Sequence, residues 1–484
     1  MVRIPIALLA GLLFGGVSLA EPLALTDCRI SAGPGFPSMK ARCGTLERPL
    51  DPSDAASGTI QLKVAVVPAL DLVPEPDPLV PIAGGPGQGT VEFYAAYANA
   101  FEHVRRSRDI LLIDQRGTGE SSRMDCPVDD DLLDGQYSTE LTIEYTKACL
   151  EQLPADPRFF TTSVAVTDLE AVREALGYPS VNLYGISYGT RVAQHYARRY
   201  PGSARTVVLD GVVPPQLSLG PEIATESQKA VNAILARCAE DASCKKRFPD
   251  IQNTFERVLD ELRESPVTID VPHPGSGRLE QTAFGRNELA LAIRLLAYHA
   301  NSIALLPLLI NEAGNGNYVP LVAQYKVTVI AMTDALSLGM HNAVVCTEDV
   351  PFFDETKIDY RGISATYMGA LQLRALEAIC SLWPDGPIDP AFKTPLSTDL
   401  PVLLLSGDAD PITPPRYAEM AALNLSNARH LIGRHQGHGQ IGVGCTSRLV
   451  ANFIDTADPE GLDAECLERS FVMPFFLDFS GPLP

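Results

Sequence analysis

A serine at position 187 stands where nucleophilic chemistry is possible. Residues 185–189 read Gly-Ile-Ser-Tyr-Gly, the G-x-S-x-G pattern, between an apolar run and a helical pattern. The two glycines permit a sharp, strained turn that exposes the serine Oγ above a sheet. The following amide, on Tyr188, then lies at a helix N-terminus, where it can donate to an oxyanion. Ser187 is therefore our candidate nucleophile.

A nucleophilic serine requires a general base and a carboxylate that orients the base. We predict that the acid is Asp410, which follows the apolar run at residues 401–405 and precedes the turn-forming Pro411. Asp408 lies two residues earlier on the same loop and is the alternative acid. The competing structural interpretation is that Asp410 only stabilises the turn before the next helix.

Three histidines, His430, His435 and His438, lie at or after the last apolar run. We predict that His438 is the base, because it stands between two glycines on a turn that can aim its imidazole at the serine. His435 is the alternative, and His430 falls inside a predicted strand, which favours a structural role. The resulting chain order of serine, acid and histidine is the one expected when the serine occupies a G-x-S-x-G turn.

A second glycine-rich turn, Gly84-Gly85-Pro86-Gly87, follows the apolar run at residues 78–83. Main-chain N–H groups can approach a substrate only where side chains are missing. We therefore predict that Gly85 and Tyr188 supply the two oxyanion donors. A phosphate-binding loop is the rival interpretation, but no Lys-Ser/Thr follows and no G-x-G-x-x-G fits.

Apolar runs alternate with helical patterns around these residues. We expect strands near residues 78–83, 109–114, 180–185, 206–210, 400–406 and 429–432, and helices near 167–176, 191–199 and 447–453. Continuously apolar strands suit a parallel sheet that helices cover on both faces, so the predicted fold class is α/β. The run at residues 59–67 alternates at its start and is predicted to be an edge strand.

The alternation stops after residue 216 and returns near residue 396. Residues 217–395 contain amphipathic helical stretches without clear parallel strands between them, for example 222–237, 288–298 and 369–379. We therefore expect one sheet domain in two parts, residues 21–216 and residues 396–484 with a C-terminal tail. The segment between them is expected to be a large, mainly helical lid.

Residues 1–20 are predicted to be a secretory signal peptide. Arg3 precedes an apolar run that ends in Ser18-Leu19-Ala20, a small-x-small cleavage site. A membrane anchor is the alternative, but the run is shorter than the roughly 20 residues of a spanning helix. We expect export to a periplasm or to the medium, with no stable membrane association after the signal is removed.

The ten cysteines of an exported chain indicate disulfides, because an oxidising compartment lets them persist. We expect each cysteine to pair with its neighbour in sequence: Cys28–Cys43, Cys126–Cys149, Cys238–Cys244, Cys346–Cys380 and Cys445–Cys466. No CxxC spacing occurs and no histidine flanks a cysteine pair, so no metal or other cofactor is expected.

The net charge of −21 disfavours nucleic acid and anionic lipid as partners. A composition of 46% hydrophobic and 20% charged residues is that of a globular protein. The expected partner is a peptide or small ester substrate, and the oligomeric state is left open.

Several segments together carry a family resemblance. They are Gly84-Gly-Pro-Gly, Asp114-Gln-Arg-Gly-Thr-Gly-Glu-Ser, Gly185-Ile-Ser-Tyr-Gly-Thr, Gly407-Asp-Ala-Asp-Pro-Ile-Thr-Pro-Pro and Gly437-His-Gly. In order and spacing, over residues 78–440, they resemble the prolyl iminopeptidase and tripeptidyl aminopeptidase family of α/β-hydrolases. That family commonly has an HGGPG loop. Here Ala83 stands in place of the histidine, which leaves the main-chain donors intact.

The resemblance implies an α/β-hydrolase fold with a lid, and a serine exopeptidase that releases an N-terminal residue or short peptide. It also implies lid carboxylates that hold the substrate's free amino group, for which Glu348 is the candidate, with Asp349 beside it. The structural alternative for these two residues is a solvated acidic turn. Two other functions remain open: a carboxylesterase or lactone hydrolase on the same residues, and a binding protein without catalysis.

Overall fold

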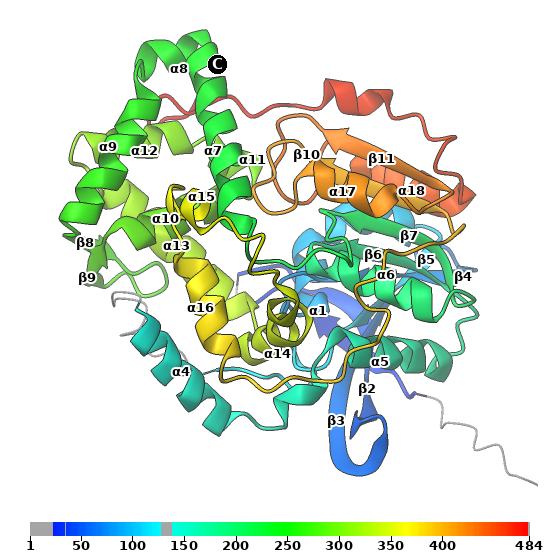
Figure 1. Ribbon diagram of the computed structural model, residues 1–484. Helices are drawn as coiled ribbons and strands as arrows, with labels where there is room; N and C mark the ends of the chain where they lie inside the picture. The colour runs from blue at the N-terminus through cyan, green and yellow to red at the C-terminus, as the bar shows by residue number, and fades with distance from the viewer. Residues whose placement is uncertain (1–22, 34, 127–137, 483–484) are drawn as a thin grey trace, which may run out of the picture.

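A computed structural model of the chain describes residues 23–33, 35–126 and 138–482; the predicted signal peptide lies outside the described residues. One sheet of nine strands has the order β1-β2-β3-β5-β4-β6-β7-β10-β11 (Figure 1). The strands are β1 (Thr26–Ile30), β2 (Met39–Asp51), β3 (Asp54–Val67), β4 (Glu75–Ile82), β5 (Arg108–Ile113), β6 (Val181–Ile186), β7 (Ala204–Asp210), β10 (Val402–Gly407) and β11 (Ala428–Gly433).

The strands from β5 to β11 in this order pair in parallel, as the apolar runs predict. The first three strands are antiparallel to their neighbours, and β3 joins them to β5. The prediction that residues 59–67 form an edge strand is wrong, because β2 pairs with the other side of β3. Since β4 lies between β5 and β6, the turns that follow β4 and β6 are neighbours at one edge of the sheet.

Helices cover both faces of the sheet. They are α1 (Thr90–Tyr97), α2 (Glu102–Arg105), α5 (Thr162–Ala175), α6 (Tyr188–Arg199), α17 (Pro415–Ala422) and α18 (Thr446–Thr456). Alternate side chains of β5 divide between the two layers: Leu111 packs in the core with α5, α6 and α17, and Leu112 in the core with α1, α2 and α18. Helix α5 begins at Thr162, earlier than the predicted start near residue 167.

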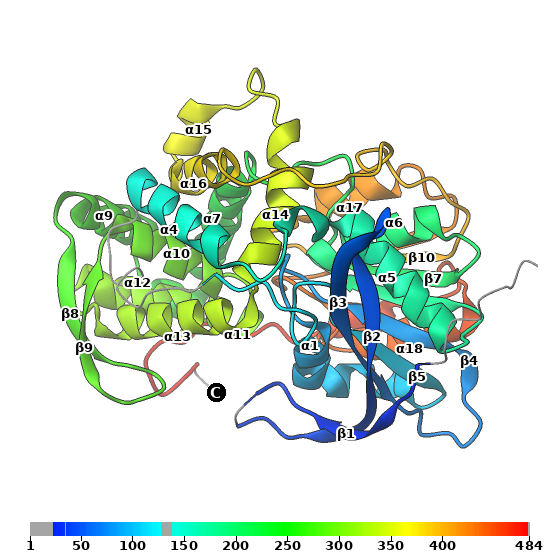
Figure 2. The ribbon, with the colours of Figure 1, turned by 90° about the horizontal axis from the view of Figure 1, so that it is seen from below.

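Residues 217–395, the predicted lid, form a mainly helical layer beside the sheet (Figures 1 and 2) and are called the lid below. Its helices are α7 (Ile223–Glu240), α8 (Ala242–Arg247), α9 (Ile251–Glu264), α10 (Arg286–Leu296), α11 (Ala300–Ile303), α12 (Leu306–Gly314), α13 (Val319–Ala335), α14 (Leu338–Glu348), α15 (Tyr360–Ser364) and α16 (Leu371–Cys380). An antiparallel hairpin of β8 (Val267–Pro272) and β9 (Leu279–Phe284) adds to the helices. Its half-exposed strands lack the continuous apolar run by which the parallel strands were predicted.

Two segments from outside residues 217–395 also pack against the lid. Helix α4 (Thr139–Gln152) lies along α16, and both belong to one small apolar core (Figure 1). The C-terminal tail, red in Figure 1, crosses from the sheet to the lid. There Phe475 is buried, with the guanidinium of Arg237 4.5 Å from its ring centre, and the N–H of Phe476 donates to the carbonyl of Ala304 over 3.0 Å.

All five predicted disulfides are present, each between neighbouring cysteines. They are typical of proteins that fold outside the reducing cytosol. Within the described parts of the chain, no helix has both the length and the apolar character needed to cross a membrane.

Candidate active site

Ser187 occupies a strained turn between β6 and α6, with φ 55° and ψ −125°. The glycines on either side are required by close packing. A Cβ on Gly185 would lie 2.3 Å from the carbonyl oxygen of Gly189, and a Cβ on Gly189 would lie 2.2 Å from the carbonyl oxygen of Ile82. The steric reasoning from the G-x-S-x-G pattern is therefore confirmed at this turn.

Asp410 and His438 form a hydrogen-bonded pair. The Nδ1 of His438 lies 2.8 Å from Oδ2 of Asp410. The same oxygen accepts from the hydroxyl of Thr413 over 2.7 Å, and Oδ1 accepts from the N–H groups of Ile412 and Thr413 over 2.8 and 3.0 Å. The carboxylate is thus fully bonded and 3% exposed, which fixes its direction toward the imidazole.

Burial and charge act in opposite directions on this pair. Burial alone would lower the pKa of His438, but the charge of Asp410 and its hydrogen bond outweigh burial and raise that pKa above 6.5. Burial alone would raise the pKa of Asp410, but the charge of His438, the hydrogen bond from it and the two main-chain donors lower it below 3.8. Asp410 is therefore ionised at neutral pH and stabilises a positively charged imidazole.

The loops that carry Ser187 and His438 lie against each other. A Cβ on Gly439 would be 3.0 Å from Cδ1 of Ile186, the residue before the serine. A Cβ on Gly211 would be 2.9 Å from Cε1 of His438, while the preceding residue, Asp210, accepts the N–H of Ser187 over 2.9 Å. The structure thus brings the serine loop and the histidine loop together from β6, β7 and the turn after β11.

Asp210 fixes the loop that carries His438 through hydrogen bonds to its main chain. Its buried carboxylate accepts the N–H groups of Gln440 and Ile441 over 2.8 and 2.9 Å, and the hydroxyl of Tyr184 over 2.7 Å. Burial raises its pKa to about 6, against the opposing effect of these hydrogen bonds. Asp210 was not among the predicted site residues, although its place at the carboxyl end of β7 is that of a residue near a sheet-edge site.

The glycine-rich turn after β4 lies beside the serine. A Cβ on Gly84 would be 3.0 Å from Cβ of Ser187 and 3.6 Å from its Oγ. The next residue, Gly85, is exposed and has φ 106°, a conformation that favours glycine. Tyr188 is the first residue of α6, where main-chain N–H groups have no partner within the helix. Tyr188 thus directly follows the serine and Gly85 directly follows the glycine that packs on it, and their role as oxyanion donors stays a prediction.

The alternative residues of the sequence analysis lie elsewhere. Asp408 is exposed and accepts the N–H of His435 over 2.6 Å. His430 lies in β11, as expected, with Nε2 2.9 Å from the hydroxyl of Ser406. The geometry therefore favours Asp410 over Asp408 and His438 over His435.

Glu348 and Asp349 are buried at the end of α14, so the alternative of a solvated acidic turn is wrong. Glu348 accepts the N–H and the hydroxyl of Thr162 over 2.7 and 2.9 Å, and the Thr162 hydroxyl lies 2.5 Å from that of Tyr188. Burial raises the pKa of Glu348 to about 7. Glu348 thus contacts protein on both oxygens, and its role toward a substrate amine stays a prediction.

Asp349 forms a two-point ion pair with the guanidinium of Arg191, at 2.9 and 3.0 Å. Arg191 lies on α6, one turn after Ser187. Burial alone would raise the pKa of Asp349, but the charges of Arg191 and Lys393 lower it. This pair ties the lid to the helix that begins at the serine.

Two further contacts of His438 were not predicted from the sequence. The hydroxyl of Thr413 lies 3.1 Å from Nδ1 of His438, and the ring of Tyr298 packs edge-on against the imidazole with centroids 5.4 Å apart. Thr413 had a local signal, since a threonine three residues after an aspartate often bonds to it. Tyr298 had none, because it lies in the lid, far from His438 in sequence.

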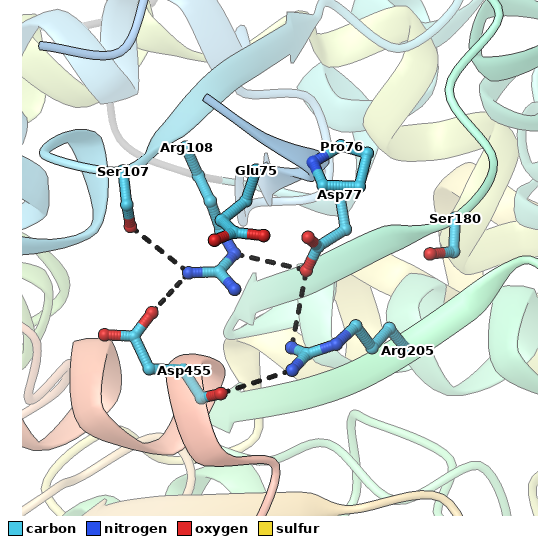
Figure 3. A pocket seen from close by; sticks show the side chains of 8 residues that line it. All are labelled: Glu75, Pro76, Asp77, Ser107, Arg108, Ser180, Arg205 and Asp455. Carbon is cyan, nitrogen blue, oxygen red and sulfur yellow. Dashed lines mark hydrogen bonds and ion pairs between the residues drawn. The ribbon is translucent and has the colours of Figure 1, made fainter. Parts of the chain in front are cut away.

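A pocket at the opposite edge of the sheet has no part in this arrangement. Figure 3 shows Arg108 and Arg205 in it, both directed at Asp77. Arg108 donates to Asp77 over 3.1 Å and also pairs with Asp455, while Arg205 lies 3.4 Å from Asp77. These charges are paired within the protein, at the end of the strands away from Ser187.

Comparison with known proteins agrees with the fold. Residues 77–441 match the alpha/beta hydrolase fold family. The serine protease Hip1 of Mycobacterium tuberculosis is 25% identical over 457 residues, which cover 84% of this chain and 83% of Hip1. A tripeptidyl aminopeptidase of Streptomyces lividans is 30% identical over 148 residues, which cover 27% of this chain and 28% of that protein.

YuaR of Escherichia coli, a protein named as a hydrolase, is 30% identical over 243 residues, which cover 47% of this chain and 48% of YuaR. This chain therefore matches about half the length of YuaR. The family match extends from the start of β4 to the loop that carries His438, and so includes the sheet edge where Ser187, Asp410 and His438 lie. The chain belongs to the α/β hydrolase fold family.

Proposed function

We propose that this chain is an exported serine exopeptidase that releases an N-terminal residue or short N-terminal peptide through an acyl-enzyme. One observation carries the proposal: Asp410 bonds Nδ1 of His438 over 2.8 Å, and the loop that carries His438 packs against the strained turn of Ser187. A bonded Nδ1 leaves Nε2 to act on the serine hydroxyl, which is the division of roles that a serine hydrolase requires.

In the proposed first half-reaction, Oγ of Ser187 attacks the scissile carbonyl carbon and Nε2 of His438 takes the Oγ proton. The carbonyl oxygen becomes an oxyanion, which the N–H groups of Gly85 and Tyr188 stabilise. The imidazolium, held by Asp410, then gives its proton to the leaving amine. The C–N bond breaks, and the N-terminal fragment remains on Ser187 as an ester.

In the second half-reaction, Nε2 of His438 takes a proton from water while the water oxygen attacks the ester carbonyl. The same two N–H groups stabilise the second oxyanion. Collapse of this intermediate breaks the bond to Ser187 Oγ, which takes the proton back from His438. The N-terminal fragment leaves as a carboxylate and the enzyme returns to its starting state.

Several features support a peptide substrate and export. The relatives include proteins named serine protease and tripeptidyl aminopeptidase. Residues 217–395 lie beside the sheet (Figure 1), and a lid there that limited access to Ser187 would suit cleavage near a chain end. The sequence pattern of residues 1–20 and the five disulfides support export.

The test uses the mature wild-type protein and Ser187→Ala. We expect a fluorophosphonate to label the wild type at Ser187, and mass spectrometry of a defined peptide library to show products cut near free N-termini. Ser187→Ala should lose labelling and nearly all turnover, with a melting temperature close to that of the wild type. Preference for blocked peptides or plain acyl esters would overturn the exopeptidase proposal in favour of an esterase, and absence of labelling would overturn serine catalysis itself.

A further inference from the structure

Arg294, on the last turn of α10 in the lid, is a buried cation without a carboxylate partner. Its side chain donates to the hydroxyl of Ser227 over 3.0 Å and lies 3.9 Å from the sulfur of Met368. Within residues 23–33, 35–126 and 138–482, no carboxylate pairs with it. The residue is only 8% exposed.

The other buried cations differ in this respect. Arg108 pairs with Asp77, Arg116 with Asp168, Arg191 with Asp349 and Lys326 with Glu280. A buried charge is costly unless it is paired, so proteins rarely keep an unpaired one without a use. Among the described residues Arg294 has no anionic partner, which leaves its charge free for a bound anion.

The position of Arg294 relates it to the proposed active site. The Ser227 hydroxyl that accepts from Arg294 donates in turn to the carbonyl of Pro411, the residue after Asp410, over 3.2 Å. One helical turn further along the chain, Tyr298 packs its ring against His438. The positive charge of Arg294 also acts to lower the pKa of His438. Two hydrogen bonds and one ring contact thus connect this cation to the acid–histidine pair.

The side of the substrate that Arg294 faces follows from the role of His438. In the proposed mechanism His438 gives its proton to the leaving amine, so groups around the imidazole lie next to the leaving-group part of the substrate. A guanidinium there can bind a carboxylate at two points.

We propose that Arg294 binds a substrate carboxylate on the leaving-group side of the scissile bond. The proposal rests on the proposed function and names its substrate class: peptides whose leaving part carries a carboxylate close to the cut. That carboxylate is either the free C-terminus of a short leaving part or the side chain of an acidic residue directly after the cut.

Two matched substrate pairs distinguish the two sources. The first compares Ala-Ala and Ala-Ala-Ala-Ala with their C-terminal amides, and the second compares tetrapeptide amides with Glu or Gln after the scissile bond. We expect the wild type to prefer the carboxylate member of one pair by roughly 10- to 100-fold in kcat/KM, mainly through KM. Preference in the first pair identifies the C-terminal carboxylate, and preference in the second identifies the side chain.

Arg294→Gln should abolish this preference by lowering kcat/KM for the carboxylate substrate to the level of its uncharged counterpart, and Arg294→Lys should restore part of the preference. Arg263→Gln is the matched control, because Arg263 is an exposed lid arginine that pairs with Asp260. Fluorophosphonate should still label Ser187 in all three variants, which shows that the site is folded. Equal rates within both wild-type pairs would overturn the proposal, as would a preference that survives in labelled Arg294→Gln. Failure of the wild type to label would instead overturn the proposed function.

Discussion

The main-chain N–H of His438 donates to the carbonyl of Tyr298 over 2.6 Å. The two residues come from different parts of the chain, since Tyr298 follows α10 of the lid and His438 follows β11 of the sheet. A Cβ on Gly437 would lie 2.2 Å from the same carbonyl, so the histidine loop packs directly on the lid. The segment 217–395 therefore helps to set the position of the proposed base.

Tyr298→Ala should lower activity by misplacing the imidazole. The substitution removes the ring that packs against His438 but keeps the carbonyl that accepts its N–H. Small displacements of a general base cost roughly 10- to 100-fold in kcat. Steady-state kinetics should show this loss mainly in kcat, whereas Tyr298→Phe, which keeps the ring, should stay near the wild type. Equal activity of the Ala and Phe variants would show that the ring contact has no positioning role.

Asp410→Asn should remove most activity and move its pH dependence. The substitution keeps the shape of the side chain but removes the charge that raises the pKa of His438. Turnover should fall by roughly 10⁴-fold. In the wild type the neutral imidazole is lost as pH falls through a pKa above 6.5, so the acid limb of kcat/KM should lie above 6.5. In the variant the limb of the remaining activity should lie at lower pH.

Asp408→Asn is the control for this prediction, because Asp408 is exposed and bonds the N–H of His435. Its pH profile should overlay that of the wild type. If Asp408→Asn caused the larger loss, the acid would have to be reassigned to Asp408.

Glu348→Gln should make the protein more stable at neutral pH relative to the wild type. Burial raises the pKa of Glu348 from 4.5 to about 7, so the folded state favours the neutral carboxyl. As pH rises from 4.5 to 7, the unfolded chain ionises this group before the folded chain does, and the wild type loses stability. Glutamine does not ionise, so this loss should be absent from the variant.

The measurement is the difference in melting temperature between Glu348→Gln and the wild type, which should grow by a few degrees between pH 5 and pH 8. Glu261→Gln, at a half-exposed position on α9, should show no such trend. Parallel melting curves for Glu348→Gln and the wild type would mean that Glu348 ionises normally in the folded protein.

Local signals account for what could be predicted from the sequence. The turn of Ser187 depends on glycines two residues away, and the loop of Asp410 depends on the apolar run before it and the proline after it. Each of these features lies within a few residues of the side chain that it positions. The parallel strands were predictable for the same reason, because a strand buried on both faces is apolar throughout.

Contacts between distant segments account for what was missed. Tyr298 contacts His438, and Arg294 connects through Ser227 to the residue after Asp410, only because the lid folds back onto the sheet edge. No residue near Tyr298 or Arg294 in sequence indicates these contacts. Glu348 likewise accepts a hydrogen bond from Thr162, which stands far from it in the chain. Residues 59–67 were likewise predicted to form an edge strand, but they lie inside the sheet because β2 pairs with the outer side of β3.

Phe475→Ala should destabilise the protein even though Phe475 lies in the C-terminal tail. The side chain is 6% exposed, packs in the core of the lid and contacts the guanidinium of Arg237. Removal of a buried phenylalanine side chain costs roughly 3–5 kcal/mol. Phe479, a few residues further along the same tail, is 62% exposed, so Phe479→Ala should leave the free energy of unfolding within about 0.5 kcal/mol of the wild type.

Chemical denaturation of both variants tests the role of the tail, with activity followed in parallel. If the tail fastens the lid to the sheet, Phe475→Ala should also lower activity at denaturant concentrations below the main unfolding transition. The reason is that the lid would detach and Tyr298 would no longer contact His438. Equal stability of the two variants would show that the tail lies on the lid without fastening it. Loss of stability without early loss of activity would show that the lid stays docked without the tail, through contacts such as those of Tyr298 with His438 and of Asp349 with Arg191.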